Sequence, residues 1–273
     1  MDRFGEIRAR LVEMAQQDGQ LLAVIAIGST TRAHVPADEF SDLDVIIATR
    51  EPEAWLYGDR PCRLGEMRIS FVEPTLGGGF ERRMLYEGSL DVDLLVFTPE
   101  QLLEAIRRGE AGWVMNRGYQ VLHDGMGVTP LLQQAIPPQA AYSPMDEGAF
   151  VNMVNDFFFH AVWTEKKLRR GETWTAKMCL DAYLKRHLLK ALEMARCTET
   201  DVWHDGRFLD QWAGADTAQE LRACFAHYDR EDMAKALAAT VRLFARLGRE
   251  AAQKHGYAWP RDAEAYARGL LGA

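Results

Sequence analysis

Hydrophobic residues in the first half of the chain fall in short runs and alternating patterns, whereas in the second half they recur at helical spacing. Apolar side chains three or four positions apart over residues 4–17 predict an amphipathic helix. A continuous apolar run that stops at Gly28 predicts a buried strand, and a run rich in valine and isoleucine predicts a second one. The expected strands cover residues 21–27, 42–49 and 66–73, with a hairpin over residues 82–97.

The pattern changes at a proline-containing stretch near the middle of the chain. This stretch, residues 136–144, resembles a linker. Before it, Thr98 and Gly109 mark the two ends of a helix. Strands early and helices late predict an α+β protein, with a mixed-sheet domain over residues 1–136 and an all-helical domain over residues 145–273. The helices expected after the linker cover residues 146–170, 173–196, 217–226 and 230–255.

Charge and composition narrow the class of function. The 273 residues carry a net charge of −8, which argues against a protein that grips a nucleic-acid backbone and suits a cationic or neutral small acceptor. No apolar run reaches the ~18 residues of a membrane span. The four cysteines form no metal-binding pattern and are expected to be buried free thiols, as in a reducing cytosol. A cytoplasmic protein is therefore expected.

Three acidic positions and one glycine–serine pair carry the candidate chemistry. Gly28-Ser29 ends a buried strand, where backbone N–H groups and a hydroxyl can bind phosphate, although most such pairs are turns. Asp42 and Asp44 share one face of the next strand, because strand residues two apart point the same way. Asp93 enters a later apolar strand, where a carboxylate is costly unless it is paired or bound to metal. These oxygen ligands suit Mg²⁺.

Together these features resemble the nucleotidyltransferase superfamily that includes DNA polymerase beta, and within it the streptomycin (aminoglycoside 6-) adenylyltransferase family. The resemblance extends from about residue 20 to residue 260. The Gly-Ser pair and the three aspartates are specific for the superfamily. Less specific motifs in the second half of the chain indicate the family. The matching stretches are GSTTR followed by FSDLDVI, LGEMR, LYEGSLDVDLLVF, RRGETWTAKMCLDAYLKRHLLKALE, HDGRFLDQW and HGYAWP.

The resemblance implies a reaction in which AMP passes from ATP to a hydroxyl of an aminoglycoside such as streptomycin, so that the cell becomes resistant to the drug. It implies two Mg²⁺ ions held by Asp42, Asp44 and Asp93, and a triphosphate in contact with Gly28 and Ser29. The active site is expected in the cleft between the two domains. Arg32 would pair with phosphate, and a solvated loop arginine is the alternative for it.

The expected helix over residues 173–196 supplies candidates for the acceptor side. A hydroxyl nucleophile benefits from a general base, for which Asp181 is the first candidate and Glu172 the second. Lys177, Asp181 and Lys185 are spaced four apart and share one helix face, so either lysine would contact phosphate while Asp181 faces the acceptor. An exposed ladder of salt bridges explains the same spacing.

Two alternatives to streptomycin adenylylation stay open. The first is the same chemistry on another small acceptor, such as a lincosamide or a metabolite. The second is a binding or antitoxin-like module that keeps the fold and lacks the activity. The intact set of Asp42, Asp44 and Asp93 argues against a silent module, because such a protein has no reason to retain three clustered acids.

Overall fold

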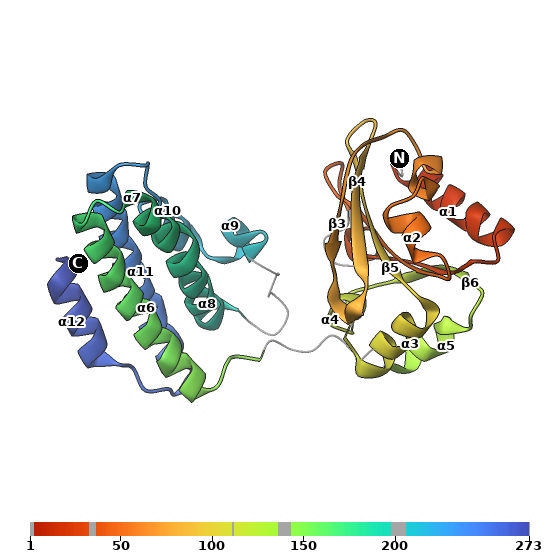
Figure 1. The fold of residues 1–273 in the computed structure, drawn as a ribbon. Coiled ribbons are helices and arrows are strands. Elements are labelled where there is room, and N and C mark those ends of the chain that lie inside the picture. Colours follow the sequence, from red (N-terminus) through yellow and green to blue (C-terminus); the bar gives the residue numbers. More distant parts are fainter. Residues whose placement is uncertain (1–2, 33–36, 111, 136–142, 198–205, 273) are drawn as a thin grey trace. The chain divides into compact units, whose positions relative to one another are not determined.

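The computed structural model describes residues 3–32, 37–110, 112–135, 143–197 and 206–272. Its contacts divide the chain into two compact units, Met1–Ala140 and Ala141–Ala273 (Figure 1). The first unit holds a mixed sheet and the second is helical, which confirms the predicted α+β class. The expected linker lies largely outside the described residues, so the limits of the two domains, residues 1–136 and 145–273, remain a prediction.

The first unit is built on one six-stranded sheet with the order β3-β4-β5-β2-β1-β6. Only β2 and β5 pair in parallel, and every other neighbouring pair of strands in this sheet is antiparallel. The central strands are almost continuously apolar because both faces of the sheet are covered there. The strands are β1 (Leu21–Ile27), β2 (Leu43–Thr49), β3 (Met67–Pro74), β4 (Phe80–Tyr86), β5 (Leu90–Phe97) and β6 (Gln120–Asp124).

Helices pack on both faces of this sheet and enclose two hydrophobic cores. Trp55 and Leu11 are fully buried in the core on one face, and Phe97 and Ile106 are buried in the core on the other. Thr98 caps α3 in a capping box with Gln101, as its position in the sequence predicts. The helices are α1 (Gly5–Gln17), α2 (Pro52–Leu56), α3 (Pro99–Arg108), α4 (Gly112–Met115) and α5 (Val128–Ala135), with 3-10 turns at Gly28–Thr31, Arg60–Arg63 and Leu76–Gly78.

The second unit packs long helices around a core rich in phenylalanine. Phe157 of α6 stacks on Phe244 of α11, with ring centroids 3.5 Å apart, and Phe158 meets Phe244 edge to face. None of the described helices combines the length and the apolar surface that a membrane crossing requires. The helices are α6 (Glu147–Arg169), α7 (Thr173–Met178), α8 (Leu184–Arg196), α9 (Leu209–Trp212), α10 (Ala215–Arg222), α11 (Arg230–His255) and α12 (Arg261–Leu271).

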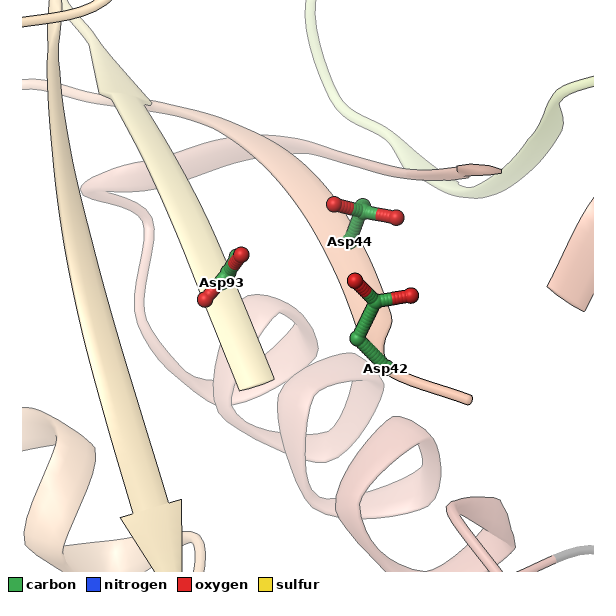
Figure 2. A group of neighbouring side chains, drawn as sticks. All are labelled: Asp42, Asp44 and Asp93. Atoms are coloured by element: carbon green, nitrogen blue, oxygen red, sulfur yellow. The ribbon is translucent and has the colours of Figure 1, made fainter. Parts of the chain in front are cut away.

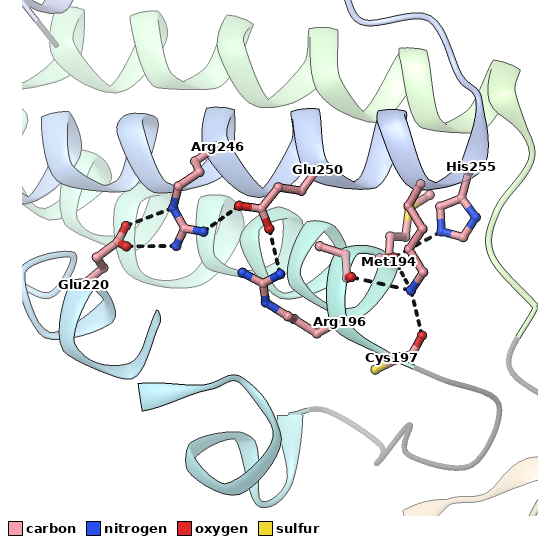
Figure 3. Close-up of polar contacts among 9 residues, drawn as sticks. Met194, Arg196, Cys197, Glu220, Arg246, Glu250 and His255 are labelled. Atoms are coloured by element: carbon pink, nitrogen blue, oxygen red, sulfur yellow. Dashed lines mark hydrogen bonds and ion pairs between the residues drawn. The ribbon is translucent and has the colours of Figure 1, made fainter. Parts of the chain in front are cut away.

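A line of polar contacts fixes α11 against its neighbours (Figure 3). Arg246 bridges Glu220 and Glu250, and Glu250 also pairs with Arg196 at 2.8 Å. At the end of α8, Lys254 donates to the carbonyl oxygens of Met194 and Cys197. A cation at a helix C-terminus satisfies carbonyls that have no partner within the helix. These contacts therefore stabilise the helical unit.

Several sequence predictions need correction. The helix expected over residues 173–196 is two helices, α7 and α8, joined by a π-helical turn at Cys179–Tyr183. A π turn adds a residue to the helix and rotates the next helical segment about the axis, which apolar spacing alone does not reveal. The prediction that all four cysteines are buried is wrong for Cys62, which is exposed. Strand β6 and helices α2, α5 and α12 have no counterpart among the predicted elements.

Candidate active site

Three carboxylates converge where β2 and β5 begin. The parallel register of these strands places Asp44 directly opposite Asp93, and Asp42 immediately precedes β2. Figure 2 shows Asp44 and Asp93 on the two neighbouring strands and Asp42 at the start of one of them. One oxygen from each of the three lies within 4.8 Å of the others. Such a separation suits oxygen ligands that share a cation, so the three aspartates singled out in the sequence form one possible metal site.

The Gly28-Ser29 turn is fitted to these carboxylates. Gly28 follows β1 with φ of +74°, a backbone conformation that disfavours residues with a side chain. A Cβ atom at this position would lie 1.9 Å from Oδ2 of Asp44, so the glycine also makes room for the carboxylate. The Ser29 hydroxyl donates to the backbone oxygen of Asp42 at 3.2 Å. The turn and the acidic strand are therefore packed as one piece.

Asp93 lies in an unusual electrostatic environment. Its residue is 2% exposed, and its Oδ1 atom has no hydrogen-bond partner among the described residues. Burial raises the pKa of Asp93 to about 8, although the nearby Arg83 guanidinium opposes that rise. Glu81 and Asp44 raise the same pKa through repulsion between like charges. A buried carboxylate with one unsatisfied oxygen is a group that a bound cation would stabilise.

This environment predicts how the stability of the metal-free protein depends on pH. Because the pKa of Asp93 is raised in the folded state, the unfolded chain releases this proton near pH 4 and the folded chain retains it to about pH 8. Stability should therefore fall as pH rises across that window. In EDTA, the melting temperature of Asp93→Asn should exceed that of the wild type by more at pH 8 than at pH 5. An equal difference at both pH values would contradict this expectation.

Charged neighbours on β4 complete this end of the sheet, and the sequence analysis did not identify them. Arg83 pairs with Asp93 at 2.9 Å and with Glu81 at 2.8 Å, and Glu73 of β3 lies 3.4 Å from the same guanidinium. The sequence does indicate that Glu81 and Arg83 lie on the same face of their strand, because they are two positions apart. What the sequence does not give is that β4 lies beside β5 with Arg83 opposite Asp93.

An apolar cavity adjoins the carboxylates on the same face of the sheet. Ile46 and Leu95 each lie two positions after an acidic ligand on β2 and β5, so their side chains point the same way as Asp44 and Asp93. Apolar walls with a few polar groups nearby are typical of small-molecule sites. The cavity is lined by Ile27, Ile46, Thr75, Leu76, Gly77, Leu95, Phe97, Leu102, Ala105, Ile106, Glu110 and Met115.

The sequence profile of a protein family described as streptomycin adenylyltransferase matches residues 1–269, which is nearly the whole chain. The chain belongs to the streptomycin adenylyltransferase family. It is therefore an enzyme of the nucleotidyltransferase class, and adenylyl transfer is the activity that membership supports. Enzymes of this class generally use ATP and a divalent metal, and the structure brings Asp42, Asp44 and Asp93 together in one acidic cluster.

Solved structures of similar fold include an aminoglycoside 6-adenyltransferase from Bacillus subtilis, which is 16% identical, with 98% of this chain and 99% of that chain covered and a TM-score of 0.44. A nucleotidyltransferase-like protein from Exiguobacterium sibiricum is 13% identical, with 91% and 78% covered and a TM-score of 0.33. A CCA-adding enzyme in complex with ATP is 12% identical, with 96% and 68% covered and a TM-score of 0.33. No curated protein matches the sequence.

In this adenylyltransferase, the candidate residues of the helical unit have defined partners. Asp181 lies in the π-helical turn and pairs with Lys177 at 2.5 Å, and both side chains are less than a third exposed. The Oδ1 atom of Asp181 is buried without a hydrogen-bond partner in the described part of the chain. Lys185 instead donates to Oγ1 of Thr240 at 3.0 Å, and its burial lowers the pKa of its amine to about 8.

The remaining two candidates lie at turns. Glu172 precedes α7 and pairs with Lys167 at 2.7 Å and with Arg170 at 2.8 Å, so its carboxylate is held at the end of α6. Hydrogen bonding to Lys167 lowers the pKa of Glu172. Arg32 comes directly after the 3-10 turn that contains Gly28 and is half-buried. Glu172 is therefore committed to local contacts, whereas one carboxylate oxygen of Asp181 has no partner in the chain as far as it is described.

Proposed function

We propose that this enzyme transfers AMP from ATP to a hydroxyl of an aminoglycoside such as streptomycin, and that the modification confers resistance to the drug. The observation that carries the proposal is the convergence of Asp42, Asp44 and the buried Asp93 beside the Gly28-Ser29 turn, in a chain that belongs to the streptomycin adenylyltransferase family. Adenylylation would attach a bulky anion to the drug where it contacts its target.

The residues present suit Mg²⁺, and two ions are expected. The donor set consists of carboxylate oxygens, which Mg²⁺ prefers, and the buried Oδ1 of Asp93 is an acceptor without a partner among the described residues. Asp42, Asp44 and Asp93 would hold the ions, which neutralise charge on the reacting phosphate and align it for in-line displacement. Gly28 and Ser29 would contact the triphosphate, and Arg32 would pair with phosphate.

A cationic acceptor is consistent with the charge of the protein. The net charge of −8 attracts cations over about the Debye length and disfavours nucleic acid as a partner. The test is release of pyrophosphate from ATP with streptomycin present, with Mg²⁺ or with EDTA. Release that requires both streptomycin and Mg²⁺ supports the proposal. Pyrophosphate release only with another acceptor would show that streptomycin is not the substrate. The absence of release with any acceptor would indicate a binding module without the activity.

Asp181 is proposed as the base that accepts the proton of the attacking hydroxyl. Asp181 is favoured over Glu172 because its Oδ1 atom has no hydrogen-bond partner among the described residues and its other oxygen pairs with Lys177, whereas the carboxylate of Glu172 is held by two cations. Lys177 and Lys185 are proposed to assist at phosphate, although Lys185 is turned toward Thr240 in this structure.

Replacing Asp181 by asparagine should lower turnover by roughly 10²–10⁴-fold, which is the usual contribution of a general base. Binding of ATP and Mg²⁺ should stay near that of the wild type, measured by calorimetry beside the kinetics. Asp216→Asn is a matched control, because Asp216 is an exposed acid of the same unit in the first turn of α10. Normal turnover in Asp181→Asn would mean that the ion pair with Lys177 is structural, and loss of ATP binding would move Asp181 to the nucleotide site.

A further inference from the structure

Arg83 is an arginine that contacts Asp93 of the acidic cluster and two further carboxylates. It lies on β4 directly opposite Asp93 of β5, and its Nη2 atom is 2.9 Å from Oδ2 of Asp93. The same guanidinium contacts Glu81 of its own strand at 2.8 Å and Glu73 of β3 at 3.4 Å. Hydrogen bonding to Glu81 is the largest of the effects that raise the pKa of Arg83.

The two ends of the Asp93–Arg83 pair are unequal. The Asp93 side chain is 3% exposed, whereas the Arg83 side chain is 45% exposed. A carboxylate buried to that extent is costly without a compensating cation, but a half-exposed guanidinium is readily hydrated. In this structure Arg83 supplies Asp93 with a positive charge.

Arg83 also has other carboxylates within reach. If the guanidinium leaves Asp93, its contact with Glu81 at 2.8 Å is already made, and Glu73 is close enough to strengthen. The Glu81 side chain is largely buried, with 14% of its surface exposed. Because a planar guanidinium presents five N–H donors, it can exchange one carboxylate for another without losing charge-assisted hydrogen bonds. The release of Asp93 should therefore cost little on the arginine side.

We propose that Arg83 is a resident counter-cation, which pairs with Asp93 when that carboxylate is ionised in the ion-free enzyme and yields it to the divalent ion while Glu81 and Glu73 retain the guanidinium. The inference rests on the proposed metal-binding role of Asp93. Arg83 is then a competitor of the metal, which sets how tightly the empty site attracts ions. A supporting residue that oriented Asp93 toward the metal would act in the opposite direction, because losing such support typically weakens metal binding 10–100-fold.

The two roles predict opposite signs for one measurement. Mn²⁺ alone is titrated into the enzyme at about pH 9, where Asp93 is ionised, without nucleotide or acceptor, and free Mn²⁺ is quantified by electron paramagnetic resonance. Replacing Arg83 by methionine should tighten Mn²⁺ binding about tenfold, because a charge-assisted contact of ~1.5 kcal/mol no longer has to be broken. Arg83→Gln should act in the same direction. A single cooperative melting transition in EDTA at the same pH shows that each variant is folded, and its midpoint should lie below that of the wild type because the ionised Asp93 has lost its counter-charge.

The controls separate this effect from a general change in charge. Arg68→Met removes an arginine that pairs with Glu66 and Glu87 on exposed parts of the same sheet, and it should leave Mn²⁺ affinity within about twofold of the wild type. In an Asp93→Asn background, Arg83→Met should no longer tighten binding, which makes the pair a double-mutant cycle. Unchanged or weaker binding in Arg83→Met would overturn the inference alone. A wild type that binds no Mn²⁺ would overturn the proposed metal site as well.

Discussion

Replacing Asp44 by asparagine should lower the rate of adenylyl transfer by at least about 100-fold, or roughly 3 kcal/mol in activation free energy, while both units stay folded. Asp44 lies opposite Asp93 in the register of β2 and β5, and its carboxylate converges with those of Asp42 and Asp93. An amide keeps the size of the side chain and removes the charge that a divalent ion requires. Steady-state kinetics with saturating Mg²⁺ and ATP measure the effect.

Asp91→Asn provides the comparison for this loss. Asp91 shares the strand and the face of Asp93, but it is exposed and lies outside the converging group. This variant should keep most of the activity. The melting temperature of Asp44→Asn in EDTA should equal or slightly exceed that of the wild type, because repulsion within the acidic group is relieved. If Asp44→Asn retained more than about a tenth of wild-type turnover, Asp44 would not be a metal ligand.

Replacing Gly28 by alanine should abolish most of the activity through the same carboxylate. The new Cβ would lie 1.9 Å from Oδ2 of Asp44, so either the turn or the aspartate must move. The positive φ of Gly28 adds strain of about 1–2 kcal/mol for any residue with a side chain. A displacement of about 1 Å in a catalytic group typically costs about 100-fold in rate. The expected result is a loss of about that size together with weaker Mn²⁺ binding.

Gly88→Ala separates the two consequences of this substitution. Gly88 has φ of +78° in the turn between β4 and β5, and nothing lies within 4 Å of the position that a Cβ would take. The control therefore carries a similar backbone strain without a collision. Gly88→Ala should melt at a lower temperature and turn over like the wild type. Equal losses of turnover in both variants would show that the effect at Gly28 is strain alone.

The acidic site was predictable from the sequence only in part. The alternation along each strand shows that Asp42 and Asp44 share a face, and the apolar setting of Asp93 marks it as unusual. Their convergence depends on β2 and β5 pairing in parallel, although two other strands lie between them in the chain. The register between strands that are distant in sequence is set by packing of the whole sheet. The sequence alone therefore does not group Asp93 with Asp42 and Asp44, and that grouping was inferred from the family resemblance.

Other features depend on packing that a local pattern does not show. The π turn at Cys179–Tyr183 interrupts a stretch whose spacing is typical of one helix, so Lys185 bonds to Thr240 of α11 and not to Asp181. Strand β6 is short and only partly buried, so its sequence carries no clear strand pattern. It forms by pairing with β1 at the edge of the sheet. Strand parity predicts the face of the strand on which Arg83 lies, but it does not predict that Asp93 lies opposite Arg83 on the neighbouring strand.

The most direct test of adenylyl transfer is mass spectrometry of the acceptor after incubation with the enzyme, ATP and Mg²⁺. A panel of streptomycin, other aminoglycosides, a lincosamide and uncharged alcohols should be compared, with Asp44→Asn as the inactive control. Streptomycin or a related aminoglycoside should gain the mass of one adenylyl group, which is AMP less one water, pyrophosphate should appear in equal amount, and EDTA or Asp44→Asn should prevent both. Addition of AMP to an uncharged acceptor alone, or product formed equally by Asp44→Asn, would contradict the proposed function.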